Sequence, residues 1–160
     1  MRQAEIIAVG KVNASYFRDG CAEYLKRIGP MCRLTVTEIP ESKLSGSGDA
    51  AERQVIEAES RKIEEHLSKE KNLFRIAMCI EGKQMSSEML AELIGRQTDA
   101  GKKPAFIIGG SLGLSDELKN SADLKLSMSE MTFPHQLARL MLLEQIYRAL
   151  TILGNIKYHK

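Results

Sequence analysis

The sequence predicts an α/β fold in which a mostly parallel sheet is covered by helices on both faces. Short apolar, β-branched segments alternate along the chain with segments whose apolar residues recur at helical spacing. Expected strands such as A-F-I-I-G, residues 105–109, have no polar residue for a wet face, which is typical of strands buried on both sides. The 160 residues contain no internal repeat and no linker, so we expect a single domain, 1–160.

Five strands are expected, each from a run of aliphatic or β-branched residues bounded by turn-forming residues. The second, R-L-T-V-T-E-I, alternates between apolar and polar residues, while the others are short apolar runs. A loop containing S-G-S-G follows it over residues 40–49. The expected strands span residues 5–9, 33–39, 73–80, 105–109 and 124–127.

Five helices alternate with these strands. The first has apolar residues at helical spacing and ends at Gly29. The second is charged over most of its surface, and the third follows a cap at Ser86 or Ser87. Ser115 is the expected cap of a short fourth helix, and Thr132 that of the last helix. The expected helices span residues 15–28, 50–67, 87–100, a short segment after 115, and 134–153.

The composition is that of a globular chain with an aliphatic core, since 43% of the residues are apolar, only 5% are aromatic and Trp is absent. The net charge of +2 conceals an uneven distribution. Residues 1–36 carry six basic and three acidic side chains, residues 37–100 nine and thirteen, and residues 101–160 eight and five. Two basic ends around an acidic middle indicate an anionic partner, although charges placed only for solubility would give the same pattern.

The three cysteines, Cys21, Cys32 and Cys79, are odd in number and lack the spacing of a disulfide or zinc framework. We expect reduced residues, with Cys21 and Cys79 in the core, and no metal site. No run of about 20 uncharged apolar residues is present, and the first residues lack the pattern of a signal peptide. These observations predict a cytoplasmic protein without a membrane span.

In open α/β sheets, ligands bind at the carboxyl ends of the strands, and three such ends are notable here. The first, C-I-E-G-K, is an ordinary turn when taken alone. The second, G-G-S-L-G-L-S-D-E, would let a nucleoside approach the backbone, but a plain tight turn explains it equally well. The third, L-S-M-S-E-M-T-F-P-H-Q, places Met128, Met131 and Phe133 in a loop, where they must contact the core or the ring of a ligand.

The three histidines differ in context. His66 lies on the charged helix and is expected to be solvated. His135 lies in the first turn of the last helix, where a structural hydrogen bond is expected in preference to catalysis. His159 belongs to the terminal N-I-K-Y-H-K. RNA-contacting tails use the same residue types: lysine for phosphate, tyrosine for stacking, and histidine for a base edge or a proton.

Several of these motifs together resemble one family. G-G-S-L-G-L, the run L-S-M-S-E-M-T-F-P-H-Q-L-A-R-L-M-L-L-E-Q-I-Y-R-A and the terminal Y-H-K are similar to those of the ribosomal large-subunit pseudouridine N3-methyltransferases, the RlmH family. I-I-A-V-G-K and E-Y-L-K-R-I-G-P match as well, so the resemblance extends over nearly the whole chain. Lys157 is a departure, because many relatives have Pro or Ala before the terminal Tyr-His.

The resemblance implies a SPOUT methyltransferase fold with a C-terminal trefoil knot, which physical reasoning alone would not predict. It implies a homodimer that uses S-adenosyl-L-methionine to methylate N3 of a pseudouridine in 23S rRNA on the assembled 70S ribosome, with no role for DNA or a membrane. The three strand ends would then be the cofactor loops. The cofactor-binding residues implied are Met78, Gly109, Gly110, Met128, Ser129, Glu130, Met131, Thr132 and Phe133.

The catalytic residues implied are His159, Tyr158 and Arg139. The proton on N3 would leave to His159 or to a bound water, and Arg139 or Arg148 would stabilise the developing anion. A helical pair with Glu144 is the more ordinary role for Arg148. Arg139 has no acidic residue four positions away, so we expect it to contact RNA or the other subunit. The alternative functions are a non-catalytic ribosome- or RNA-binding module and a related tRNA methyltransferase.

The last helix, residues 134–153, has apolar residues in every direction. A helix that is apolar all round must be buried all round. We therefore expect it to lie between the sheet and a second subunit, with Ile146 at the seam and Glu144 paired with Arg148 inside.

Overall fold

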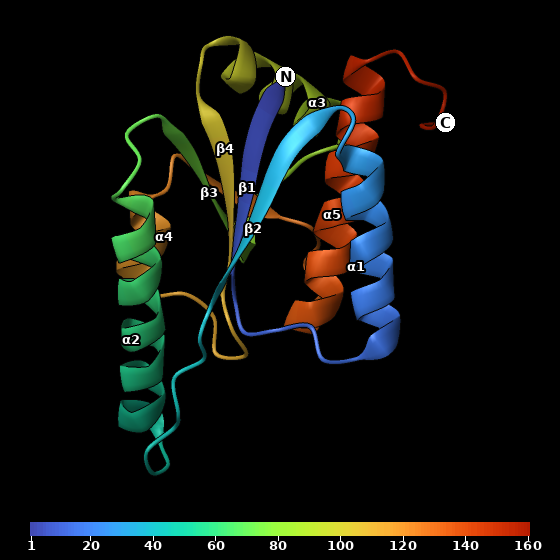
Figure 1. The fold of residues 1–160 in the computed structure, drawn as a ribbon. Coiled ribbons are helices and arrows are strands. Elements are labelled where there is room, and N and C mark those ends of the chain that lie inside the picture. The colour runs from blue at the N-terminus through green and yellow to red at the C-terminus, as the bar shows by residue number, and fades with distance from the viewer.

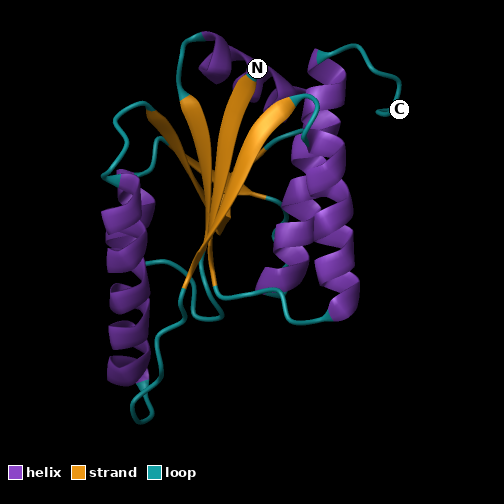
Figure 2. Ribbon diagram, viewed as in Figure 1, coloured by secondary structure: helices purple, strands orange, loops and turns teal.

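A five-stranded parallel sheet runs through the middle of the molecule, in the order β2-β1-β4-β3-β5. In this computed structural model, which describes residues 1–160, helices cover both faces of the sheet (Figure 1, Figure 2). The predicted α/β class is confirmed. The elements are β1 Arg2–Val9, α1 Ser15–Ile28, β2 Cys32–Ile39, α2 Asp49–Leu67, β3 Leu73–Gln84, α3 Ser87–Asp99, β4 Lys103–Ile108, α4 Asp116–Ser121, β5 Leu124–Ser127 and α5 His135–Leu153.

The strands contribute to two separate cores, because successive side chains of a strand point to opposite faces of the sheet. Ile6 of β1 packs with α1, α3 and α5 in the larger apolar cluster, whereas Ile7 packs with α2 and α4 in the smaller one. The same alternation separates Phe106 from Ile107 in β4. All four side chains are fully buried, as expected for strands covered on both faces.

The largest difference from the predicted boundaries is in β3, which continues to Gln84 through residues expected to form a turn. Met78 and Lys83 both lie opposite Leu126 of β5, so the residues between them form an irregular loop within the strand. A Cβ on Gly82 would lie only 2.7 Å from the backbone N of Leu126. This close approach of two backbones explains the glycine.

The predicted helix caps are partly confirmed. The Ser86 and Ser115 side chains each accept a hydrogen bond, 3.1 Å long, from the backbone N three residues later. Thr132, however, is not the cap of α5. The cap position is Pro134, which offers no side-chain acceptor, and α5 therefore begins without a side-chain cap.

Helix α5 packs on the sheet between α1 and α3, and the view in Figure 1 shows its close alignment with α1. Ile146 is fully buried within a single chain, so it cannot lie at a subunit seam and that expectation is wrong. Leu137 and Met141, farther from the sheet, remain half-exposed. None of the helices, α5 included, has the length and apolarity needed to cross a membrane.

Glu5 of β1 is a buried carboxylate, 4% exposed, with partners from three other segments. It accepts a hydrogen bond from Thr37 Oγ1 at 2.8 Å, and it lies 2.6 Å from His66 Nε2 and 3.3 Å from Lys103 Nζ. The expectation of a solvated His66 is therefore wrong. Burial raises the pKa of Glu5, but the hydrogen bonds and the charge of Lys103 outweigh it, and the net pKa lies below its usual value.

Replacing Glu5 with Gln should lower the free energy of unfolding by about 2–3 kcal/mol at pH 7, because Lys103 loses its buried counter-charge. A carboxylate whose pKa is lowered by folding stabilises the fold above its unfolded pKa of about 4.3. That contribution is lost as the pH falls through the folded value. Urea unfolding of both proteins at pH 7 and at several values below 4.3 measures the effect. A loss of stability in Glu5→Gln that stays constant as the pH falls below 4.3 would show that Glu5 is not ionised in the folded protein.

Candidate functional site

A cavity of about 770 Å³ opens at the carboxyl ends of three neighbouring strands, β4, β3 and β5. Its lining comes from residues 78–81 of β3, where the regular pairing with β5 is interrupted, residues 108–114 at and after the end of β4, and residues 126–129 and 131–135 from the end of β5 to the start of α5. Ala138 and Leu142 of α5 close one wall. These are the three strand ends singled out in the sequence, so the fold brings all three motifs to one site.

Eight of the nine residues expected to hold the cofactor line this cavity. They are Met78, Gly109, Gly110, Met128, Ser129, Met131, Thr132 and Phe133. Glu130 does not line it, and its position is exposed.

The loop after β4 folds back on its own backbone. Gly110 and Gly113 form a short antiparallel bridge, and Gly113 has a φ of +86°, which favours glycine. A Cβ on Gly109 would lie 2.7 Å from the carbonyl carbon of Gly113. The two interpretations of this motif, a tight turn and a ligand loop, therefore describe the same structure: the turn needs glycines, and the glycines leave backbone facing the cavity.

The loop after β5 is held by short-range hydrogen bonds. Ser127 Oγ donates to the carbonyl of Ser129 at 2.9 Å, and Ser129 Oγ accepts from Met131 N at 3.0 Å. Met128 and Phe133 are half-buried, whereas Met131 is 73% exposed. An apolar side chain this exposed at the wall of a cavity is poised to contact a ligand.

Charged groups lie at one side of the cavity. Lys119 Nζ is 2.6 Å from Glu81 Oε1 and 3.4 Å from Asp116 Oδ1. The hydrogen bond with Lys119 holds the pKa of Glu81 below its usual value, and the same bond raises the pKa of Lys119. Cys79, expected in the core, is half-buried and lines the cavity instead. Burial raises the pKa of its thiol, so Cys79 is a neutral thiol at pH 7.

Glu59 lies behind the glycine loop and was missed from the sequence. It is buried, its Oε2 accepts from Ser42 N at 3.0 Å, and its Oε1 has no hydrogen-bond partner. Burial raises its pKa. Its Oε1 would lie 3.1 Å from a Cβ on Gly110, so the carboxyl supports the loop from outside. The signal was present in the sequence, because Glu59 continues the i,i+4 series of Val55 and Ile63 on the apolar face of α2.

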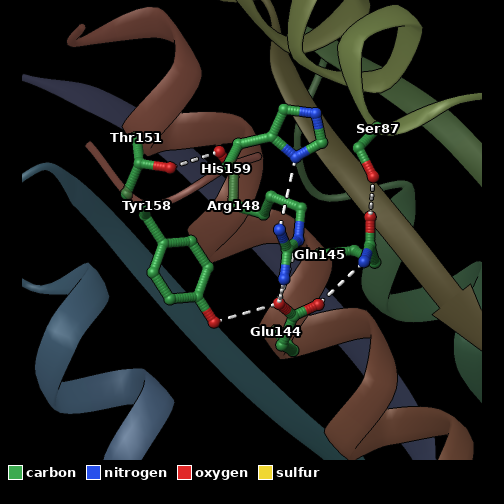
Figure 3. Close-up of polar contacts among 7 residues, drawn as sticks. All are labelled: Ser87, Glu144, Gln145, Arg148, Thr151, Tyr158 and His159. Carbon is green, nitrogen blue, oxygen red and sulfur yellow. Dashed lines mark hydrogen bonds and ion pairs between the residues drawn. The ribbon is translucent and has the colours of Figure 1, made fainter. Parts of the chain in front are cut away.

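The chain terminus is docked against α5 (Figure 3). Tyr158 Oη donates to Glu144 Oε1 at 3.1 Å, and Arg148 Nε donates to the same oxygen at 3.0 Å, which confirms the predicted Glu144–Arg148 pair. Ser87 Oγ donates to Gln145 Oε1, and Gln145 Nε2 donates in turn to Glu144 Oε2 (Figure 3). Burial, followed by hydrogen bonds with Tyr24 and Glu144, raises the pKa of Tyr158 to about 12.

His159 has a partner on each ring nitrogen. Arg148 Nη1 lies 3.2 Å from Nδ1 (Figure 3), and Glu88 Oε1 lies 2.6 Å from Nε2. Because a guanidinium can only donate, Nδ1 accepts the hydrogen bond from Arg148. Nε2 then carries the ring proton and donates a hydrogen bond to Glu88 Oε1. Neither nitrogen is free to take a substrate proton in this arrangement.

A second cavity of about 420 Å³ joins the first to the region of the docked terminus. The two share Met78, Met128 and Leu142 in their walls. The second cavity continues along α5 past Met141 to Glu144, the acceptor of the Tyr158 hydroxyl. The structure thus connects the cofactor motifs to the tail through a mostly apolar groove.

Arg139 differs from its expected placement. It is 5% exposed, its Nη1 pairs with Glu38 Oε2 at 2.7 Å, and its Nη2 donates to the carbonyl of Gly10 at 3.0 Å. It lacks an acidic partner on its own helix, as the sequence indicated, but β2 supplies one. The expectation that Arg139 is free for RNA or a second subunit is wrong, because its guanidinium faces inward.

Replacing Gly109 with Ala should destabilise the fold by about 1–3 kcal/mol, because the added Cβ meets backbone that cannot yield without opening the loop. Replacing Gly29 with Ala is the matched control. That glycine has right-handed helical φ and ψ, and the nearest atom to its Cβ is at 3.5 Å. Urea unfolding of the three proteins makes the comparison. Equal stabilities for the two variants would contradict the close packing at Gly109.

Comparisons with known proteins agree with this geometry. A family model described as predicted SPOUT methyltransferase matches residues 2–159. A protein of Clostridium kluyveri is 43% identical over 157 residues, which are 97% of this chain and 98% of that protein. Proteins of Carboxydothermus hydrogenoformans and Bifidobacterium adolescentis are 45% and 46% identical, and each match also covers 97% of this chain and 98% of the relative. All three carry the name ribosomal RNA large subunit methyltransferase H.

A solved structure shares the fold at lower sequence similarity. It is described as a probable methylase family protein from Haemophilus influenzae Rd KW20, with a TM-score of 0.57 and 14% identity, covering 98% of this chain and 70% of that one. The family model and the three close relatives span nearly the whole chain and confirm the resemblance carried by the motifs. The chain belongs to the SPOUT methyltransferase family and, within it, to the ribosomal RNA large subunit methyltransferase H family.

Proposed function

We propose that this protein is a homodimeric, S-adenosyl-L-methionine-dependent methyltransferase that methylates N3 of a pseudouridine in 23S rRNA on the 70S ribosome. The single observation that carries the proposal is the cavity at the ends of β3, β4 and β5, built from the motifs that mark the family. The names of the close relatives support ribosomal RNA of the large subunit as the substrate.

The residues present suit a nucleoside-containing cofactor. The volume of about 770 Å³ lies in the range of small-molecule sites, and such sites combine apolar walls with a few polar groups. Met78, Met128 and Phe133 offer faces for a purine ring, and Gly109 and Gly110 leave backbone free to approach it. Glu81 provides a carboxylate at the wall for hydroxyl or ammonium groups. When bound, the cofactor would supply a sulfonium methyl group and a neutral leaving group.

The chain's own task is then to align the nucleobase and to handle its N3 proton. His159 is the proposed base, with a bound water as the other route. Its contact with Glu88 is a hydrogen bond to an exposed carboxylate. Once a substrate displaces Glu88 and Arg148, the ring can take the other tautomer, in which Nε2 is the acceptor. Arg148 is the proposed stabiliser of the developing anion, because its side chain is 25% exposed beside the tail, whereas that of Arg139 is 6% exposed and faces inward. Tyr158 stays protonated and can donate its hydroxyl or stack on a base.

A trefoil knot near the C-terminus is part of the proposal. Its support lies where β3 meets β5. Met78 and Lys83 of β3 both lie opposite Leu126, and Gly82 touches the backbone of the same residue. Residues 79–82 of β3 therefore leave the regular pairing with β5 and pack closely on its backbone, as two segments of a knotted chain would.

The homodimer is supported by the apolar side of α5. Leu137, Leu140 and Met141 line the groove of about 420 Å³ and stay half-exposed in a single chain. A second copy seated on this groove would bury them and would lie beside both the cavity and the docked tail. The seam would then run along Met141 in place of Ile146.

Labelled methyl transfer from the cofactor should occur to 70S ribosomes and should be weak or absent on free large subunits and tRNA. Calorimetry should detect cofactor binding by the free protein, and Gly109→Ala should abolish it while Gly29→Ala should not. Ribosome binding without cofactor binding would identify a non-catalytic ribosome-binding module. Transfer to tRNA in preference to ribosomes would identify a tRNA methyltransferase.

In the same assay, His159→Ala should lower the rate of transfer by about 10²–10⁴-fold and remove the rise of the rate with pH that a histidine base imposes. Cofactor binding should be unchanged. Ile156→Ala, which removes an exposed apolar side chain from the same tail, is the control for disturbance of the tail. An unchanged rate and pH profile would remove His159 as the base and leave the bound water.

Met141→Glu should give a folded monomer, because it places a charge on the half-exposed side of α5 without entering the core. Analytical ultracentrifugation measures the association state, and circular dichroism checks the fold. Met89→Glu on α3 is the control, since Met89 is an exposed methionine away from the groove. A dimer that survives Met141→Glu would place the seam elsewhere.

A further inference from the structure

The geometry points to a second RNA contact on this protein, which rests on the proposed function: the segment 11–18, between β1 and the first turn of α1. We infer that Tyr16 stacks on an unpaired base near the target nucleotide, while Lys11 and Arg18 bind the adjoining phosphates. Three independent observations support this inference.

The first observation is the exposure of Tyr16. Its side chain is 71% exposed, in a chain with only four tyrosines, four phenylalanines and no tryptophan. The ring is not loose, because it lies 4.5 Å from the ring of Phe17, centroid to centroid, in a tilted pair. Phe17 itself is half-buried and anchors the pair to α1. A rigid aromatic ring held out in water is the element on which single-stranded RNA bases stack.

The second observation is the position of the segment beside the cavity. Asn13 N and Ala14 N both donate to Gln136 Oε1, at 3.0 and 3.4 Å. Gln136 follows His135 in the first turn of α5, and His135 lines the cavity. Figure 1 shows the β1–α1 connection passing the start of α5 at the end of the molecule where the strands end. Tyr16 is thus two residues beyond a backbone tether to the wall of the site.

The third observation is the state of the nearby cations. Seven of the chain's basic side chains form ion pairs with carboxylates, namely Arg2, Arg27, Arg75, Lys103, Lys119, Arg139 and Arg148. Lys11 and Arg18 are exposed and are among the sixteen of the 23 lysines and arginines that form none. Segment 11–18 contains no acidic residue, and Asp19, which follows it, is exposed. Two uncompensated cations flanking an exposed ring match phosphate and base together.

The chemistry favours RNA over a protein partner. Protein interfaces are depleted in lysine and enclose their aromatic residues among apolar neighbours. Here an exposed ring at a helix start has a lysine and an arginine on either side of it in the sequence, and all three side chains are exposed. A second copy of the chain is the competing occupant, and the association state of the variants distinguishes the two.

The test compares Tyr16→Ala, Tyr16→Trp and the pair Lys11→Ala/Arg18→Ala with the control pair Arg33→Ala/Lys102→Ala. Arg33 and Lys102 are exposed cations at the opposite, amino edge of the sheet. The measurements are ribosome affinity at several salt concentrations, the KM for ribosomes in methyl transfer, cofactor binding by calorimetry, and association state by ultracentrifugation.

Tyr16→Ala should weaken ribosome binding and raise the KM about tenfold with cofactor binding unchanged, and Tyr16→Trp should restore both. The Lys11/Arg18 pair should reduce the slope of log affinity against log salt by about two, one for each lost phosphate contact. The control pair should do neither. Ribosome affinity unchanged in Tyr16→Ala, an equal loss in the control pair, or a changed association state would each overturn the inference.

The measurement of ribosome affinity tests this inference separately from the proposed methyl transfer. If the wild-type protein binds ribosomes but transfers no methyl group, the proposed reaction fails and the dependence of binding on Tyr16 still decides the inference. If transfer occurs and Tyr16→Ala matches the wild type in affinity and KM, only the inference fails. If the wild-type protein neither binds ribosomes nor transfers, both fail.

Discussion

One buried guanidinium links the two ends of the chain. Arg139 of α5 has lost nearly all contact with water, so its charge must be compensated inside the protein. The carbonyl at the end of β1 and the carboxylate of Glu38 in β2 supply that compensation. The buried guanidinium would lose both partners if α5 moved, so the two contacts fix the first half of α5 against the strand ends. That half of α5 forms a wall of the cavity and carries Gln136, which tethers the β1–α1 segment.

Two close backbone contacts complete the site. Gly82 lets β3 touch β5, and Gly109 lets the loop after β4 close on Gly113. A Cβ at either position would lie 2.7 Å from backbone atoms, so both contacts require glycine. Buried Glu59 supports this loop from the α2 side of the sheet. Strand ends and glycines thus form the framework of the site. The side chains around the cavity are mainly methionines, which are adaptable, and loop residues.

Sequence patterns predicted the parts of this protein that depend on neighbours along the chain. The bounds of α1 and β5 were predicted to the residue, and the Ser115 cap and the Glu144–Arg148 pair were predicted because each spans four residues or fewer. The errors concern partners that are distant in sequence. His66 meets Glu5 across 61 residues, and Arg139 meets Glu38 across 101. No periodicity reports such pairs, so both residues were assigned to solvent or to RNA. The cavity could be predicted because parallel strands bring their carboxyl ends together whatever the intervening sequence.

The contact between Arg139 and Gly10 spans 129 positions, and it has a consequence for how the molecule is made. During synthesis, α5, which covers the larger apolar cluster on β1, emerges only after the other four strands and four helices. Until then Ile6 and Phe106 lack part of their final covering, and the nascent chain exposes apolar surface. Folding can therefore be completed only after α5 has emerged, and the many long-range contacts make that step slow. A protein proposed to modify assembled ribosomes would thus become functional only after α5 has left the ribosome that makes it.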